Sequence, residues 1–175
     1  MQFGHDELLE RLQNLDEEVD LMFDTDDQFK IVIVGGGALI LLECISRATH
    51  DVDVLDAPRE LLDLMGSYDM NTGVKTFCSN FPYKYDDRLK PIDIPTRRIQ
   101  YFTASLEDIV IAKLCSDRDK DFEDISSDSV VSRIDWDLLD KLAHDEDELR
   151  ASIMNDRQYS DFLIGYDRYV RRCKP

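Results

Sequence analysis

The chain has 175 residues, of which 43% are hydrophobic and 34% are charged, so its composition is that of a folded globular protein rather than a disordered one. This length suffices for one well-packed domain, or for one domain with a small helical appendage. The 21 Lys and Arg residues against 38 Asp and Glu residues give a formal charge of −17, which argues against broad non-specific binding to DNA or RNA.

The first predicted element is an amphipathic helix near the N-terminus. Its apolar positions are spaced by four, three, four and three residues: Leu8, Leu12, Leu15, Val19 and Met22. This spacing predicts a helix whose apolar stripe packs on the core and whose other face is acidic. The polar stretch 24–27 lacks the glycine and the glutamate of a calcium loop, so we interpret it as an ordinary turn.

A strand, a glycine turn and a helix are predicted next. Residues 30–34 are apolar on both faces, as in a strand inside a covered sheet. The three glycines at 35–37 predict a tight turn, and residues 38–45 predict a buried helix. Glycine leaves backbone N–H groups unobstructed where a helix begins, which favours binding of an anion such as phosphate.

The second predicted strand, at residues 52–55, brings two carboxylates together. Side chains alternate along a strand, so Asp51 and Asp53 project from the same face. Two like charges this close are costly without a counterion, and Mg2+ prefers oxygen ligands together with substrate phosphates. The pair therefore predicts a divalent-metal site beside the glycine turn.

The remaining elements complete a mixed α/β half and a helical tail. They comprise a short helix beginning at Pro58 and ending at Gly66 or Ser67, strands at 73–78 and 98–102 separated by a long loop or an edge excursion at 79–96, a helix capped by Ser105, and helices at 136–142, 147–154 and 159–172. This order predicts an α/β core with an N-terminal helix over residues 1–125. A C-terminal helical segment, residues 126–175, is expected to pack on that core.

The cysteines and the hydropathy pattern indicate the compartment. The four cysteines form no Cys-x-x-Cys pair and the three histidines lie far apart, so neither a zinc site nor a disulfide framework is expected. The longest apolar run, residues 31–42, contains three glycines and is too short to cross a bilayer. We expect a reduced cytoplasmic protein without a membrane partner.

A dinucleotide-binding fingerprint is a competing interpretation of the glycines. Gly35 and Gly37 at a strand-to-helix turn, with Asp56 about twenty residues later, match part of that motif. Its third glycine position holds Ile40, and the second strand carries a pair of acids instead of one. A tight turn without any ligand is a further alternative, because short glycine motifs are weak signals.

Two blocks of residues carry a resemblance to a known family. The first is Val34-Gly-Gly-Gly-Ala-Leu39 followed by Arg47-Ala-Thr-His-Asp-Val-Asp53. The second is Ser105-Leu-Glu-Asp-Ile-Val-Ile-Ala-Lys113 followed by Arg118-Asp-Lys-Asp-Phe-Glu-Asp124. In order and spacing the two blocks resemble the minimal nucleotidyltransferase superfamily, and most closely its bacterial abortive-infection and toxin-antitoxin members.

The resemblance implies a fold, a reaction and a set of site residues. The implied fold is α/β (or α+β), a small mixed sheet flanked by helices with a C-terminal helical segment. The implied reaction moves a nucleoside monophosphate from a nucleoside triphosphate to a hydroxyl of an RNA or protein acceptor, with Mg2+ or Mn2+. The implied metal ligands are Asp51 and Asp53, the nucleotide-binding residues Gly35, Gly36, Thr49 and Lys113, and the catalytic residues Asp51, Asp53 and Lys113.

The chain departs from the family pattern at a third carboxylate. Many members place one on a later strand, where it activates the attacking hydroxyl and completes a two-metal site. The strand expected there reads Val74-Lys-Thr-Phe77 and contains no acid. Asp69, Asp87 and Asp93 are candidates from neighbouring loops. The alternative function is therefore a catalytically degenerate nucleotide-binding or partner-binding module of a toxin-antitoxin-like system with a cognate protein partner.

Charge patterns leave further alternatives open. A local basic group could contact an RNA acceptor or could belong to a solvated loop: Lys84, Arg88, Lys90, Arg97 and Arg98. The element Arg118, Lys120, Asp121 and Asp124 could instead be an intrahelical salt-bridge set, and Lys113 a solvated lysine on an amphipathic helix. A third functional hypothesis is that the acidic surface and the helix at 159–172 dock a basic partner.

Overall fold

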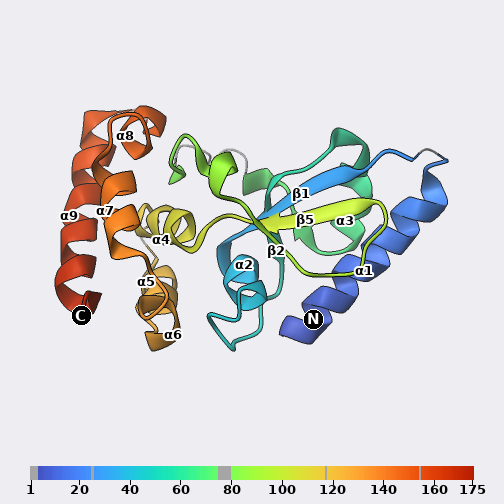
Figure 1. The fold of residues 1–175 in the computed structure, drawn as a ribbon, viewed down its shortest axis with the longest axis horizontal. Helices are drawn as coiled ribbons and strands as arrows, with labels where there is room; N and C mark the ends of the chain where they lie inside the picture. The colour runs from blue at the N-terminus through green and yellow to red at the C-terminus, as the bar shows by residue number, and fades with distance from the viewer. Residues whose placement is uncertain (1–3, 25, 75–79, 117, 154) are drawn as a thin grey trace. The chain divides into compact units, whose positions relative to one another are not determined.

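The computed structural model describes residues 4–24, 26–74, 80–116, 118–153 and 155–175. The chain forms two compact units, one of residues 1–75 with 89–104 and the other of residues 76–88 with 105–175. The first unit holds the described strands and the second is helical (Figure 1). The sequence-based boundary after residue 125 rests on the change from a mixed to a helical pattern, and it stays a prediction.

A five-stranded mixed sheet organises the first unit. Its strands are β1 (Phe29–Val34), β2 (Val52–Asp56), β3 (Met70–Asn71), β4 (Lys90–Pro91) and β5 (Ile99–Thr103), in the order β3-β2-β1-β5-β4. β1 is antiparallel to β2 and parallel to β5, whereas β2 is parallel to β3 and β4 is antiparallel to β5. The central strand β1 is buried from Ile31 to Val34, as expected for a strand covered on both faces.

Helices accompany the sheet in the described part of this unit. They are α1 (His5–Met22), α2 (Gly35–Leu41), η1 (Arg59–Leu61) and α3 (Leu62–Ser67). The apolar stripe predicted for α1 is confirmed at Leu8, Leu12, Leu15 and Val19, which are fully buried. Its last predicted member, Met22, is 61% exposed. α2 packs against β1 and β2 and beside α1 (Figure 1), which carries the glycines to the edge where β1 ends.

A buried carboxylate fastens α1 to the beginning of β5. Asp16, only 4% exposed, accepts hydrogen bonds from the backbone N–H groups of Arg97 and Arg98 at 2.8 Å and of Ile99 at 2.7 Å. Hydrogen bonds to a charged group contribute about 1.5–3 kcal/mol each. This contact therefore fixes where the helix crosses the sheet.

Two predicted elements were wrong in their bounds. The glycines lie inside the first turn of α2 instead of in a separate turn, and α2 ends at Leu41 rather than at residue 45. The strand predicted at 73–78 occurs earlier, as β3, and Gly73 and Val74 already form a helical turn. Residues 75–78 of that prediction lie outside the described residues. The reason is local: Asn71 Oδ1 accepts the Gly73 N–H at 3.0 Å, a turn that ends the strand.

The second unit consists of η3 (Tyr85–Arg88), α4 (Leu106–Leu114), α5 (Asp119–Ile125), α6 (Asp128–Val131), α7 (Trp136–His144), α8 (Leu149–Ser152) and α9 (Asp156–Cys173). The predicted cap of α4 is confirmed, because Ser105 Oγ accepts the Asp108 N–H at 3.1 Å. α9 buries Phe162, Tyr166 and Tyr169. Among the described residues, no helix is both long enough and apolar enough to cross a membrane.

Candidate functional site

The junction between β1 and α2 requires glycine at its first position. Gly35 has φ +66°, in the left-handed region that side chains disfavour. A Cβ at Gly35 would also lie 2.7 Å from Oδ2 of Asp53. Any other residue there would strain the backbone and displace the carboxylate. Gly35 and Asp53, which the sequence linked only by motif, therefore share one narrow space.

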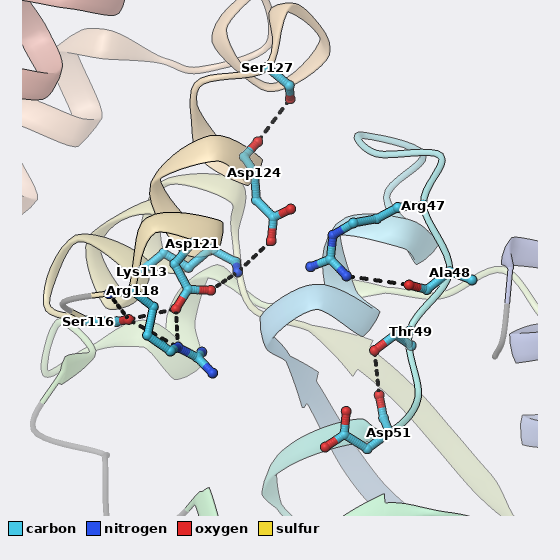
Figure 2. A network of polar contacts seen from close by, with 10 residues as sticks. All are labelled: Arg47, Ala48, Thr49, Asp51, Lys113, Ser116, Arg118, Asp121, Asp124 and Ser127. Atoms are coloured by element: carbon cyan, nitrogen blue, oxygen red, sulfur yellow. Dashed lines mark hydrogen bonds and ion pairs between the residues drawn. The ribbon is translucent and has the colours of Figure 1, made fainter. Parts of the chain in front are cut away.

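The other two glycines have different surroundings. A Cβ at Gly36 would lie 3.0 Å from Nη2 of Arg47, whose Nη1 donates to the Ala48 carbonyl at 3.4 Å (Figure 2). A side chain at position 36 would thus press on a guanidinium. A Cβ at Gly37 would lie 3.6 Å from Ile33, which is ordinary van der Waals contact. Position 37 therefore tolerates a methyl group and position 35 does not.

The predicted carboxylate pair lies at the start of β2. Val52 is fully buried, whereas Asp51 is exposed and Asp53 is half-buried. Asp53 is the second residue of β2 and points away from the face of Val52, whereas Asp51 immediately precedes the strand. That both carboxylates share one face stays a prediction. Asp53 lies opposite Val34 in β1, the residue before the glycines. The structure thus brings Asp53 to the glycine junction, and the chemical role of the pair stays a prediction.

Asn71 is the neighbour of Asp53 on the other side, and the sequence interpretation did not single it out. It lies opposite Asp53 in β3, and its Nδ2 donates to Asp53 Oδ1 at 3.0 Å. The only local signal is the order Asn71-Thr-Gly73, which is typical of a turn. Its proximity to Asp53 depends on strand pairing, which a turn signal does not reveal.

Thr49 shapes the loop that delivers Asp51. Its Oγ1 donates to the Asp51 carbonyl at 3.0 Å, and the side chain is buried (Figure 2). This bond joins the buried threonine to the residue that begins the carboxylate pair. The proposed contact of Thr49 with a nucleotide stays a prediction.

The donor set suits a hard divalent cation. Carboxylate oxygens are the ligands that Mg2+ and Mn2+ prefer, and the glycine approach leaves space that a Cβ would fill. Within the described part of the chain, no group of three or more His, Cys, Asp or Glu side chains could hold a metal ion. The sequence offered three candidates for a third carboxylate. Asp69 Oδ2 lies 3.1 Å from Arg11 Nη1. Asp93 follows β4, and Asp87 lies in η3.

Lys113, in the second unit, is buried between two carboxylates. Its Nζ donates to Asp121 Oδ1 at 2.5 Å and to Asp124 Oδ2 at 2.9 Å (Figure 2). Lys113 is 7% exposed, so the interpretation of a solvated lysine on an amphipathic helix was wrong. The two bonds join α4 to α5.

The carboxylate of Asp121 accepts hydrogen bonds from three side chains, which lower its pKa. Besides Lys113, Ser116 Oγ donates at 2.6 Å and Arg118 Nε at 2.7 Å. Burial alone would raise the pKa of the Asp121 carboxyl. The hydrogen bonds from its three donors and the charge of Lys113 outweigh burial and hold that pKa below its ordinary value. The predicted local salt bridge is thus present between Arg118 and Asp121. Asp121 and Asp124 also bind Lys113, which lies on another helix.

Two of the five residues in the predicted basic group are engaged within the fold, and contact of the group with RNA stays a prediction. Arg88 makes two 3.0 Å hydrogen bonds to the fully buried Asp108 and two, of 3.2 and 3.4 Å, to Glu148. Arg98 is 6% exposed and donates to the Phe23 carbonyl at 2.7 Å. Both arginines are therefore part of the packing of their own units, so the interpretation of all five residues as a solvated loop was wrong.

The direction of β2 decides the competing interpretation of the glycines. A dinucleotide-binding fingerprint joins two parallel strands through a crossover helix. Here β1 and β2 are antiparallel, and Asp56, the last residue of β2, lies opposite Val32 in the middle of β1. The dinucleotide alternative was therefore wrong.

The family described as a nucleotidyltransferase of unknown function (DUF6036) matches residues 10–174. Because the match covers nearly the whole chain, the protein belongs to this nucleotidyltransferase family. Comparison with curated proteins and with solved structures gave no match. The resemblance to nucleotidyltransferases is thereby confirmed, and the closer likeness to abortive-infection and toxin-antitoxin members stays a prediction.

Proposed function

We propose that the protein transfers a nucleoside monophosphate from a nucleoside triphosphate to an acceptor hydroxyl, with Mg2+ or Mn2+ held by Asp51 and Asp53. Membership in a nucleotidyltransferase family supports the reaction class. The observation that carries the site assignment is the approach of the Asp53 carboxylate to Gly35. A metal ligand and the backbone at the start of α2 thus border one small space, as a metal-bound triphosphate requires.

The residues of this site have distinct proposed roles. Gly35 and Gly36 bind phosphate oxygens through backbone N–H groups, which have no intrahelical partner in the first turn of a helix. A divalent cation bound to the carboxylate pair neutralises charge on the triphosphate. Thr49 holds the loop before Asp51 and completes the nucleotide-binding set. Catalysis then consists mainly of positioning and charge neutralisation.

Lys113 is the proposed cation for phosphate charge. Its ammonium has three N–H donors, and the bonds to Asp121 and Asp124 account for two of them. These carboxylates hold the ammonium at one point. Its proposed contribution is that of a fixed positive charge near the triphosphate, whose side chain is already ordered within its own unit.

The acceptor we favour is a protein hydroxyl. The net charge of −17 opposes an RNA backbone, and Arg88 and Arg98 are engaged inside the fold. A cognate protein of a toxin-antitoxin-like system is a proposed acceptor or inhibitor. The helix predicted to dock a basic partner ends in the exposed Arg168, Arg171 and Arg172, which disfavours a basic partner at that end.

A degenerate nucleotide-binding module is the second candidate function. The observation in its favour is that no third acid of the described residues joins the carboxylate pair in a metal-binding group. The position opposite Asp53 in β3 is instead occupied by Asn71. Such a module would bind a metal-nucleotide complex and would release no pyrophosphate.

Incubation with labelled nucleoside triphosphates tests the proposal. The full chain is supplied with each nucleoside triphosphate labelled at the α-phosphate, with Mg2+ or Mn2+, alone and in cell extract, and labelled RNA and protein are then separated. The expected result is a labelled macromolecule and released pyrophosphate. The Asp51→Asn/Asp53→Asn variant is the control and should release none. Nucleotide binding without pyrophosphate in any extract would support the degenerate module, and no binding at all would contradict both functions.

A further inference from the structure

We propose that Asn71 is a positioning residue for Asp53, which selects the carboxylate oxygen that faces the metal and phosphate site; this inference rests on the proposed function. Asn71 stands at the end of β3 and Asp53 at the start of β2, in a parallel pair. Residues opposite each other in a sheet share a face. The amide therefore lies beside the carboxylate because of strand pairing and not through a flexible loop.

The orientation of the Asn71 amide follows from its second hydrogen bond. Its Oδ1 accepts the Gly73 N–H at 3.0 Å, and its Nδ2 donates to Asp53 Oδ1 at 3.0 Å. A flipped amide would turn an NH2 group toward a backbone N–H and an oxygen toward a carboxylate, and both contacts would be repulsive. A Cβ at Gly73 would lie 3.2 Å from Asn71 Oδ1, so a glycine there gives the amide its room.

The two oxygens of Asp53 therefore have different surroundings. Oδ1 accepts the hydrogen bond from Asn71, and Oδ2 lies toward Gly35, 2.7 Å from where a Cβ would be. The hydrogen bond resists rotation of the carboxylate. Hydrogen bonds of this kind orient metal-binding side chains, and their loss typically weakens metal affinity about 10–100-fold.

Asparagine is suited to this position because it is neutral. It donates to Asp53 without adding a third negative charge next to the pair. An aspartate at position 71 could still accept the Gly73 N–H and keep the turn. It would replace the donor to Asp53 with a second carboxylate about 3 Å away, an arrangement that favours a bound cation and is costly without one.

The substitutions Asn71→Ala and Asn71→Asp separate positioning from turn formation. The full chain is titrated with Mn2+, with and without α,β-methylene ATP, and Mn2+ affinity is measured by electron paramagnetic resonance. Asn71→Ala is expected to weaken Mn2+ affinity about 10-fold or more. Asn71→Asp is expected to melt below the wild type in EDTA and to gain more melting temperature from Mn2+ than the wild type does.

Asn155→Asp is the matched control. Asn155 Oδ1 accepts the Gln158 N–H at 2.9 Å as the cap of α9, so this substitution adds the same charge and keeps the same kind of local bond. It should leave Mn2+ affinity unchanged.

Each outcome bears on either the inference or the function beneath it. Wild-type Mn2+ affinity in both Asn71 variants, with only a lower melting temperature for Asn71→Ala, would mean that the amide merely ends β3. If Asn71→Ala does not fold, Asn71→Asp alone decides, because a Mn2+ response equal to that of the wild type would overturn the inference. No wild-type Mn2+ binding would refute the proposed function, and the inference with it.

Discussion

The two units handle their carboxylates in opposite ways. In the second unit, Asp121 and Asp124 are buried against the ammonium of Lys113. In the first unit, Asp51 is exposed and Asp53 half-buried, and Asp53 accepts a hydrogen bond from the neutral Asn71 on β3. Removing one partner of a buried ion pair is strongly destabilising. Substitution of an exposed or half-buried carboxylate is expected to cost the fold less.

The second unit repeats this pattern at a second place. Arg88 binds Asp108 and Glu148, both buried. Burial alone would lower the pKa of the Arg88 guanidinium, but its hydrogen bonds and the charges of the two acids raise it overall. Removal of Arg88 would leave two buried carboxylates without the guanidinium that binds both. Ionic contacts in this unit are therefore best understood first as stabilising contacts, and the predictions below test that difference from the first unit.

The largest expected effect on stability is that of Lys113→Ala. It would remove from the buried Asp121 and Asp124 the ammonium that binds both, and breaking a buried pair in this way costs about 3–5 kcal/mol. Urea unfolding of the full chain measures the loss. Lys120→Ala, an exposed lysine on α5, is the control and should change the free energy of unfolding by less than about 0.5 kcal/mol. Equal, small effects of both substitutions would contradict the buried pairing.

This expectation reverses the one that the sequence supports. A lysine on an amphipathic helix is ordinarily solvated, and its removal would then test only phosphate binding. Because Lys113 is buried, lost turnover in Lys113→Ala could follow from lost folding. Lys113→Ala combined with Asp121→Asn and Asp124→Asn also removes the two carboxylates that the lysine bound and should recover part of the stability. Nucleotide binding by this triple variant then tests the proposed role of Lys113 separately.

Acid should destabilise the protein through the same contact. The pKa of Asp121 is held below its ordinary value in the folded state. Its stabilising contribution is therefore complete above the unfolded pKa of about 3.9 and is lost as pH falls through the folded pKa. Unfolding free energies measured over an acid pH series should fall less steeply for Asp121→Asn than for the wild type. Parallel pH profiles would contradict this assignment.

A smaller effect is expected from Gly35→Ala. The left-handed backbone costs a residue with a Cβ about 1–2 kcal/mol, and the new Cβ would meet Asp53 Oδ2 at 2.7 Å. We expect a lower melting temperature together with weaker binding of Mn2+ and nucleotide. Gly37→Ala is the matched control, since its Cβ meets only ordinary contacts and should be neutral or slightly stabilising. If the two variants behave alike, Gly35 serves packing alone.

The sequence predicted the elements better than their partners. A single sequence can predict features that follow from a local pattern of apolar residues. Examples are the periodic burial of α1, the apolar run of β1 and the alternation of β2. The direction of β2, which excludes the dinucleotide alternative, depends on contacts between strands.

The candidate site shows the same division. The motif and the family resemblance pointed to Gly35 and Asp53, yet the three glycines look alike in sequence. Only three-dimensional neighbours separate Gly35, against Asp53, from Gly36, against Arg47. Asn71 and the burial of Lys113 were not predictable for the same reason, because both depend on residues distant in the chain.

The smallest expected effect on stability is that of Asp51→Asn with Asp53→Asn, although this variant should lose metal-dependent nucleotide binding. Asp51 is exposed and Asp53 half-buried, and replacing both removes a repulsion between like charges. In EDTA we expect the free energy of unfolding to change by less than about 0.5 kcal/mol, as for surface substitutions generally. Calorimetry with Mg2+ and a nucleoside triphosphate should detect binding in the wild type only. Unchanged affinity would contradict the site, and a loss of stability as large as that of Lys113→Ala would mean that these carboxylates also serve the fold and that the two units do not differ.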